Sequence, residues 1–191
     1  ARFPMPGKRI DIGGRSLHLY CSGTGTPTVL LEAGLAVNYT TWQVVQPALA
    51  AFTRVCSYDR AGMGWSDPSP NPTLTPFVNA DLHALLTAAR INGPIVLVGH
   101  SAGGVFVRGY FREHRSDVAG MVLIDSSHEQ QKNRFPHDLQ ADAAERQMLD
   151  QIRLCKTVAW TGFVRAMETV FTGMGTTFAG SRFGVWSTGA D

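Results

Sequence analysis

Short continuous apolar runs alternate with segments of helical periodicity over the first two thirds of the chain. An alternating run around Gly13-Gly14, at residues 8–20, predicts a β-hairpin. Continuous apolar runs that close on glycine, aspartate or histidine are typical of strands buried on both faces. Four such runs follow the hairpin, at residues 28–34 (TVLLEAG), 54–59 (RVCSYD), 94–100 (PIVLVGH) and 120–125 (GMVLID).

Three amphipathic segments separate these runs and predict helices. They lie at residues 39–52, 77–91 and 102–114. Pro47 falls inside the first and should bend that helix or begin its second part. Because strands and helices alternate, we expect an α/β fold with a mostly parallel sheet, helices on both faces, and antiparallel strands at its start.

The pattern changes after residue 128. Residues 129–191 show helical periodicity and a glycine-rich tail without a recognisable strand. We therefore expect a core over residues 1–128 and a helical cap over residues 129–191. Five apolar residues of the cap are spaced by three or four and predict one stripe, which either packs onto the core or lines an acyl pocket. They are Trp160, Phe163, Met167, Phe171 and Met174.

Composition excludes several classes of partner. The net charge of +2 comes from scattered basic residues, without the dense basic stripe of a nucleic-acid binder. Cys21 and Cys56 lie in expected buried strands, where cysteine acts as a small apolar residue, so neither a disulfide framework nor a metal site is expected. The glycine-containing GTGTP and GMGTTFAG segments lack the strand-to-helix setting of a dinucleotide loop, so no cofactor is expected.

The N-terminal sequence does not indicate the cellular compartment. The chain begins ARFPMPGKRI without an initiator methionine, so we expect that an upstream segment was removed or left out. No apolar run is long enough to span a bilayer. Both a cytoplasmic and an exported protein fit these observations.

A Gly-x-Ser-x-Gly motif carries the chemistry. Gly99, Ser101 and Gly103 stand where the fourth apolar run passes into the third predicted helix. This setting predicts a sharp turn that exposes the serine, with glycines where side chains would collide with neighbouring backbone. The start of the helix favours a developing negative charge. The simpler alternative is a serine that only caps the helix.

Together with this motif, three further segments resemble the α/β-hydrolase family in sequence and in order. They are LLEAGL, YDRAGMGWSD and MVLIDSS, and the resemblance covers about residues 8–128. It implies an α/β-hydrolase fold with Ser101 as nucleophile. It also implies an oxyanion hole formed by the backbone amides of Leu35 and Ala102, with Gly34 keeping the approach to the first of these open.

The chain departs from the family pattern at one loop. Where many relatives have His-Gly, it has Ala33-Gly34, preceded by Glu32. Backbone donors do not depend on that side chain. Glu32 is either a buried carboxylate paired with an arginine such as Arg60 or an acid that supports the site.

A serine nucleophile narrows the reaction. Members of the family that open epoxides or displace halide use aspartate at this position, so Ser101 implies acyl transfer through an acyl-enzyme that water then cleaves. The apolar cap stripe favours a small hydrophobic carboxylic ester as substrate. A peptidase, a C-C bond hydrolase and a non-catalytic binding domain remain alternatives.

The acid and the base are harder to place. In the resembled family the acid follows the nucleophile and the histidine follows the acid. Asp125 is the candidate acid, or else a structural residue at the end of the last predicted strand. Among the histidines only His128 is a candidate base, and local loop chemistry explains it better. We therefore expect the last strands of the fold, with the base, on a companion C-terminal fragment.

Overall fold

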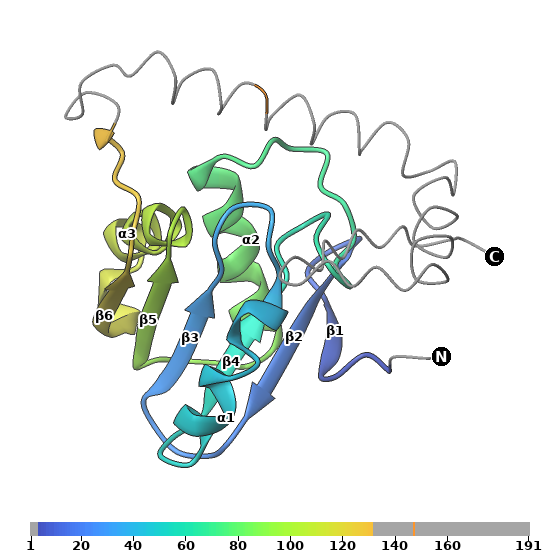
Figure 1. Cartoon of the computed structure of the whole chain (residues 1–191). Coiled ribbons are helices and arrows are strands. Elements are labelled where there is room, and N and C mark those ends of the chain that lie inside the picture. Colours follow the sequence, from blue (N-terminus) through green and yellow to red (C-terminus); the bar gives the residue numbers. More distant parts are fainter. Residues whose placement is uncertain (1–3, 132–146, 148–191) are drawn as a thin grey trace, which may run out of the picture. The chain divides into compact units, whose positions relative to one another are not determined.

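The computed structural model of the protein describes residues 4–131 and 147, and the elements below lie in the first of two units of the chain, Ala1–Glu129 (Figure 1). The strands are β1 (Lys8–Asp11), β2 (Ser16–Ser22), β3 (Thr28–Glu32), β4 (Val55–Tyr58), β5 (Ile95–His100) and β6 (Val118–Ile124). The helices are the 3-10 helix η1 (Tyr39–Trp42), α1 (Val45–Ala50), α2 (Thr75–Ala88), α3 (Gly103–Glu113) and the 3-10 helix η2 (Arg115–Asp117). The predicted cap stripe lies outside the described residues.

The six strands form one sheet in the order β1-β2-β4-β3-β5-β6. β1 pairs antiparallel with β2, and β2 pairs antiparallel with β4. β3 runs parallel to both β4 and β5, and β5 runs parallel to β6. The predicted α/β class, with a mostly parallel sheet and antiparallel strands at its start, is confirmed.

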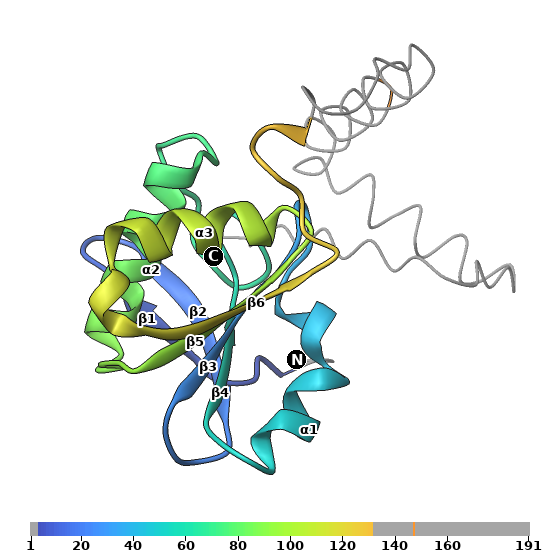
Figure 2. The same ribbon diagram turned by 90° about the vertical axis from the view of Figure 1, so that its left-hand side faces the viewer.

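Helices cover both faces of the sheet. Figure 2 shows α2 and α3 on one face and α1 on the other. Neighbouring residues of a strand point to opposite faces, and the two apolar cores follow this rule. Leu30 and Leu97 belong to the larger core, with Leu82 of α2, whereas Leu31 and Val98 belong to the smaller core. Strands buried on both faces explain the unbroken apolar runs in the sequence.

The first predicted helix is divided into two pieces. The 3-10 helix η1 ends at Trp42, and α1 begins at Val45. Pro47 lies in the first turn of α1, where a missing amide hydrogen leaves no helical hydrogen bond unmade. Proline therefore stands in the second piece, as its sequence position predicts.

The two strand cysteines are joined, which corrects the expectation that they act only as apolar residues. Cys21 of β2 lies opposite Cys56 of β4 in the antiparallel register, and the two form a disulfide with their Cα atoms 4.1 Å apart. The expectation was wrong because the run of residues around each cysteine does not reveal which strand lies beside it. Strand pairing places the two thiols face to face.

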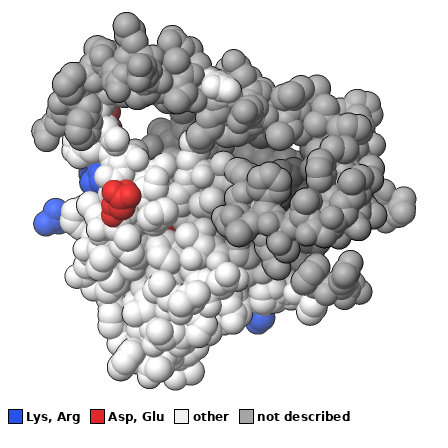
Figure 3. Space-filling view, in the orientation of Figure 1, with Lys and Arg blue, Asp and Glu red and all other residues white. Residues whose placement is uncertain are grey.

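Charged side chains are sparse on the described part of the face in Figure 3. Large apolar side chains are exposed next to α1, where Val44 is 78% and Phe52 is 85% exposed.

Within the described residues, no helix combines the length and the apolar character that crossing a membrane requires.

Candidate active site

The turn between β5 and α3 holds Ser101 in a backbone conformation that serine rarely adopts. Its φ is 53°, in the left-handed region that costs an L-residue about 1–2 kcal/mol. The Ser101 amide donates to the carbonyl of Ile124 at 3.1 Å, and the Ser101 carbonyl accepts from the amide of Ser127 at 3.0 Å. The serine is therefore held between the ends of two neighbouring strands, β5 and β6.

Glycines beside Ser101 allow three backbone segments to approach closely. A Cβ atom on Gly99 would lie 2.7 Å from the Cα atom of Gly104, and one on Gly103 would lie 2.5 Å from the carbonyl oxygen of Glu32. Both distances are too short for real side chains. The glycines of the motif thus have a steric cause: α3 packs directly onto β5 and onto the end of β3.

The loop after β3 lies against the serine. A Cβ atom on Gly34 would be 3.3 Å from the Cβ atom of Ser101 and 3.3 Å from Nδ1 of His100. Leu35 follows Gly34, and Ala102 follows Ser101 as the N-cap of α3. The two residues predicted to form the oxyanion hole therefore lie on the two segments that meet at this point.

Arg60 ties this loop to the neighbouring strand. Its guanidinium donates to the carboxylate of Glu32, to the carbonyl of Ala33 at 2.7 Å and to the carbonyl of Gly34. The Tyr58 hydroxyl donates to the other carboxylate oxygen of Glu32. The predicted pairing of Glu32 with Arg60 is confirmed. Because two of the acceptors are loop carbonyls, Arg60 also fixes the path of the backbone beside Ser101.

The network around Arg60 is fully buried, and its ionisation reflects that burial. Burial raises the pKa of Glu32, while the charge of Arg60 and the hydroxyl of Tyr58 act in the opposite direction. Burial, and then the carboxylate of Glu32, raise the pKa of Tyr58 well above its ordinary value of 10.0. The tyrosine therefore remains a hydrogen-bond donor at neutral pH, and the network serves to position the loop.

A second buried pair, between His18 and Asp59, organises the adjacent loops. The His18 ring places Nδ1 at 2.8 Å from Oδ2 of Asp59 and Nε2 at 2.6 Å from the Pro6 carbonyl oxygen. Asp59 also accepts the backbone amides of Tyr39 at 2.8 Å and Trp65 at 3.0 Å. Both nitrogens of His18 are engaged in the core, so this histidine cannot be the catalytic base.

The residue predicted as the acid has an unusual conformation. Asp125 follows β6 with a φ of 41° and is exposed. The turn after it is held by Arg108 of α3, which donates to the Ser126 hydroxyl at 3.0 Å and to the Ser127 carbonyl at 2.7 Å. Asp125 and Ser101 thus occupy equivalent positions after parallel neighbouring strands, at the edge where catalytic loops gather in such sheets.

Arg108 and Arg112 also bind Glu129 at the end of this turn. Their guanidinium groups lie 2.9 Å and 2.7 Å from its carboxylate oxygens. Burial by itself would raise the pKa of Glu129, but the hydrogen bonds from the two arginines outweigh it and lower the pKa to about 2. Glu129 is therefore ionised at neutral pH and fastens the turn to α3.

The remaining histidines lie at several places. His100 packs between Gly34 and Trp42, whose ring it meets edge-on at 6.3 Å. His128 has its Nε2 3.8 Å from the Glu129 carboxylate. His83 and His114 stack on each other at the opposite end of α3 from Ser101. His137 lies outside the described residues.

Known proteins with the same features identify the fold. The sequence profile of the alpha/beta hydrolase fold family matches residues 27–160, more than half of the chain. The chain belongs to the alpha/beta hydrolase fold family. Its membership explains the strand order, the turn that carries Ser101 and the helices on both faces of the sheet, and it confirms the resemblance carried by the sequence motifs.

The individual relatives of this chain are diverse. An uncharacterized protein of Schizosaccharomyces pombe is 43% identical over 82 residues, covering 43% of this chain and 15% of the relative. A probable transporter of Hormonema carpetanum is 35% identical over 135 residues, covering 66% of this chain and 19% of the relative. The chain therefore spans about a fifth or less of the length of these relatives.

A solved structure gives the same fold. A thermophilic esterase from Thermogutta terrifontis matches with a TM-score of 0.61 and 27% sequence identity, over 76% of this chain and 53% of the esterase. Family membership and this structural neighbour agree on the alpha/beta hydrolase fold. The chain corresponds to about half of the length of this esterase.

Proposed function

We propose that this chain carries the nucleophile of a serine hydrolase that cleaves carboxylic esters, with Ser101 forming the acyl-enzyme. The observation that carries the proposal is the strained Ser101 turn, with its φ of 53°, set directly against the Gly34 loop. A residue that only capped a helix would need neither the left-handed conformation nor the close approach of a second loop. Strain of this kind persists where the surrounding structure holds it in place.

In the proposed reaction, the Ser101 hydroxyl attacks the ester carbonyl and loses its proton to a histidine base. The carbonyl oxygen becomes an oxyanion, which the backbone amides of Leu35 and Ala102 stabilise by hydrogen bonds. The tetrahedral intermediate then expels the alcohol, which takes the proton from the histidine. Water repeats the sequence on the acyl-enzyme and releases the acid.

The base belongs, in this proposal, to a C-terminal segment outside this chain. β6 is an outer strand of the described sheet, and Val122, Leu123 and Ile124 along it are 49%, 44% and 41% exposed. An apolar outer strand with unpaired backbone groups is suited to accept a further strand. Added strands at this edge would extend the sheet beside Asp125, which we propose as the acid that orients the histidine.

The substrate is proposed to be a small hydrophobic ester. A serine nucleophile fits acyl transfer, and the structural neighbour from Thermogutta terrifontis is an esterase. The guanidinium of Arg60, which contacts the loop, is occupied by Glu32 and two loop carbonyls. It therefore offers no free charge to an anionic substrate.

A panel of chromogenic substrates tests this proposal. The whole protein that contains this chain is assayed with p-nitrophenyl esters of increasing acyl length. In parallel it is assayed with an amino-acid anilide, which tests for a peptidase, and with a substrate of C-C bond hydrolases. We expect hydrolysis of the esters that is lost in Ser101→Ala and kept in the matched variant Ser116→Ala, an exposed serine of η2. Ester hydrolysis that persists in Ser101→Ala, or activity on the other two substrates alone, contradicts the proposal.

A further inference from the structure

Three residues with metal-binding side chains meet where α2 and α3 pack together. They are His83 of α2, His114 at the end of α3, and Asp117 in η2. One potential ligand atom from each lies within 4.8 Å of the other two. The imidazole rings stack with their centroids 4.0 Å apart and their planes inclined by 5°. Three segments of the chain thus converge on one point.

Tyr110 contacts both histidines of this cluster. It is buried one turn before His114, with the two rings 4.6 Å apart. Its hydroxyl lies 3.3 Å from Nδ1 of His83. Since Nδ1 of His83 faces Tyr110, Nε2 is the nitrogen left for a ligand.

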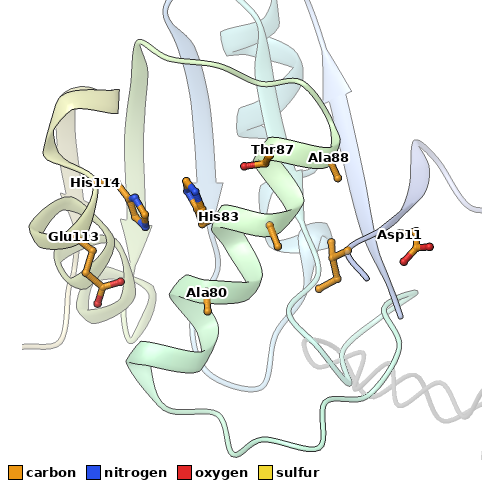
Figure 4. A pocket seen from close by; sticks show the side chains of 9 residues that line it. Asp11, Ala80, His83, Thr87, Ala88, Glu113 and His114 are labelled. Carbon is orange, nitrogen blue, oxygen red and sulfur yellow. The ribbon is translucent and has the colours of Figure 1, made fainter. Parts of the chain in front are cut away.

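The cluster borders an open pocket. The pocket has a volume of about 610 Å³, and His83 and His114 both line it (Figure 4). Figure 4 shows His83 projecting from α2 and His114 from the end of α3. Two acids, Asp11 and Glu113, also line the pocket. A ligand bound to the two imidazoles would therefore remain accessible to solvent and to small molecules.

We propose that His83, His114 and Asp117 bind a divalent transition-metal ion of the zinc class. Imidazole nitrogen and carboxylate oxygen are the ligands that Zn²⁺ takes in proteins, and three protein ligands leave a fourth position for water. The Tyr110 hydroxyl would accept a hydrogen bond from Nδ1–H of His83 and so present Nε2 to the ion. Such a partner orients a metal-binding histidine.

Binding requires a small rearrangement that the structure permits. Ligand atoms about 2 Å from a tetrahedral ion lie roughly 3.4 Å from one another, closer than the present limit of 4.8 Å. Parallel rings direct their nitrogen lone pairs the same way, so one ring must turn. His83 is exposed, whereas His114 is half-buried. We expect the His83 ring to turn about its Nδ1–Tyr110 hydrogen bond, which brings Nε2 toward the ion.

The proposed ion would fasten α2 to α3 and would take no part in ester cleavage. α3 contains 11 residues, so its two ends are about 16 Å apart. Ser101 precedes one end and His114 follows the other. The ion is therefore expected to stabilise the fold around α3, and the open coordination position would admit a small anion or water from the pocket.

A titration with Co²⁺, whose visible absorption is much stronger in a tetrahedral protein site than in water, tests the proposal on the full chain, and calorimetry with ZnCl₂ measures affinity. We expect one equivalent of metal and a higher unfolding temperature with Zn²⁺. His83→Ala and Asp117→Asn should each weaken binding by more than about tenfold, and Tyr110→Phe by about tenfold. His128→Ala, which removes another exposed histidine, should leave the titration unchanged.

The outcomes separate the proposal from adventitious binding. Circular dichroism first confirms that each variant folds. Equal Co²⁺ spectra for wild type, His83→Ala and Asp117→Asn overturn the proposal, as does loss of the bands in His128→Ala. Absence of the strong tetrahedral Co²⁺ bands in the wild type at millimolar Co²⁺ also overturns it. None of these readouts depends on ester hydrolysis, so the result is independent of the proposed function.

Discussion

The two ends of α3 are built in different ways. At the first end, glycines let backbone segments touch, and the reactive side chain, Ser101, is held by main-chain hydrogen bonds to β6. At the second end, side chains make the contacts: His83, Tyr110 and His114 meet across the two helices. Backbone packing fixes a position closely, whereas an exposed side chain such as His83 can turn to meet a ligand. The difference matches a preorganised nucleophile at one end and an adjustable ligand site at the other.

The strongest test of the Ser101 end of α3 removes the charge of Arg60, which holds the neighbouring loop. Arg60→Met leaves the fully buried carboxylate of Glu32 without its cation. Breaking a buried ion pair on one side typically costs about 3–5 kcal/mol. We expect the free energy of unfolding, measured by urea denaturation, to fall by this order. The double variant Arg60→Met with Glu32→Leu should recover much of the loss, and equal instability of both variants would show that the pair is not the cause.

A smaller effect is expected from a methyl group at the contact between α3 and β3. Gly103→Ala places a Cβ atom 2.5 Å from the Glu32 carbonyl oxygen, and overpacking of this kind costs about 1–3 kcal/mol. The helix must shift, which also moves Ser101. Gly120→Ala is the matched control, because its Cβ atom would lie 3.9 Å from the nearest neighbour. Thermal unfolding that ranks the two variants equally would contradict close packing at Gly103.

The strained backbone at Ser101 predicts that glycine at this position gives a more stable protein than alanine. Glycine adopts a φ of 53° freely, so Ser101→Gly should be more stable than Ser101→Ala by about 0.5–1 kcal/mol, after allowance for the larger entropy that glycine loses on folding. Both variants lack the nucleophile. Denaturant titration of the two variants measures how much the backbone conformation at residue 101 changes the free energy of unfolding. If the alanine variant is the more stable of the two, the turn is not strained.

The smallest effect concerns the turn after β6 and depends on pH. Since the folded pKa of Glu129, about 2, lies below its ordinary value of 4.5, the carboxylate stabilises the fold above pH 4.5 and loses this contribution as the pH falls toward 2. The pair is partly exposed, so the gain is at most about 1 kcal/mol. Glu129→Gln should therefore lower the unfolding temperature at pH 7 and not at pH 2. Glu113→Gln, which changes an exposed carboxylate at the end of α3, serves as the control.

Local patterns predicted the elements, the Ser101 turn and the pairing of Glu32 with Arg60. Each of these depends on residues close in sequence or on a buried charge that requires a partner. The disulfide between Cys21 and Cys56 and the pair between His18 and Asp59 were missed, because strand order brings them together and no local pattern encodes that order. The convergence of His83, His114 and Asp117 was also missed. It depends on how α2 packs against α3, which no local pattern encodes either.

The roles of Leu35, Ala102 and Asp125 remain predictions that rest on their places around Ser101. The domain boundary near residue 128 and the companion fragment are also predictions. They share one physical consequence: Ser101 should react as a nucleophile only when a histidine can take its proton.

The most direct measurement is reaction of the whole protein with a fluorophosphonate probe, followed by intact mass and peptide mapping. The account predicts one phosphonyl group per protein, attached to Ser101, with none in Ser101→Ala. It also predicts that this 191-residue chain alone labels much more slowly than the whole protein. No adduct in the whole protein, or an adduct on another residue, would contradict the assignment of Ser101 as the nucleophile.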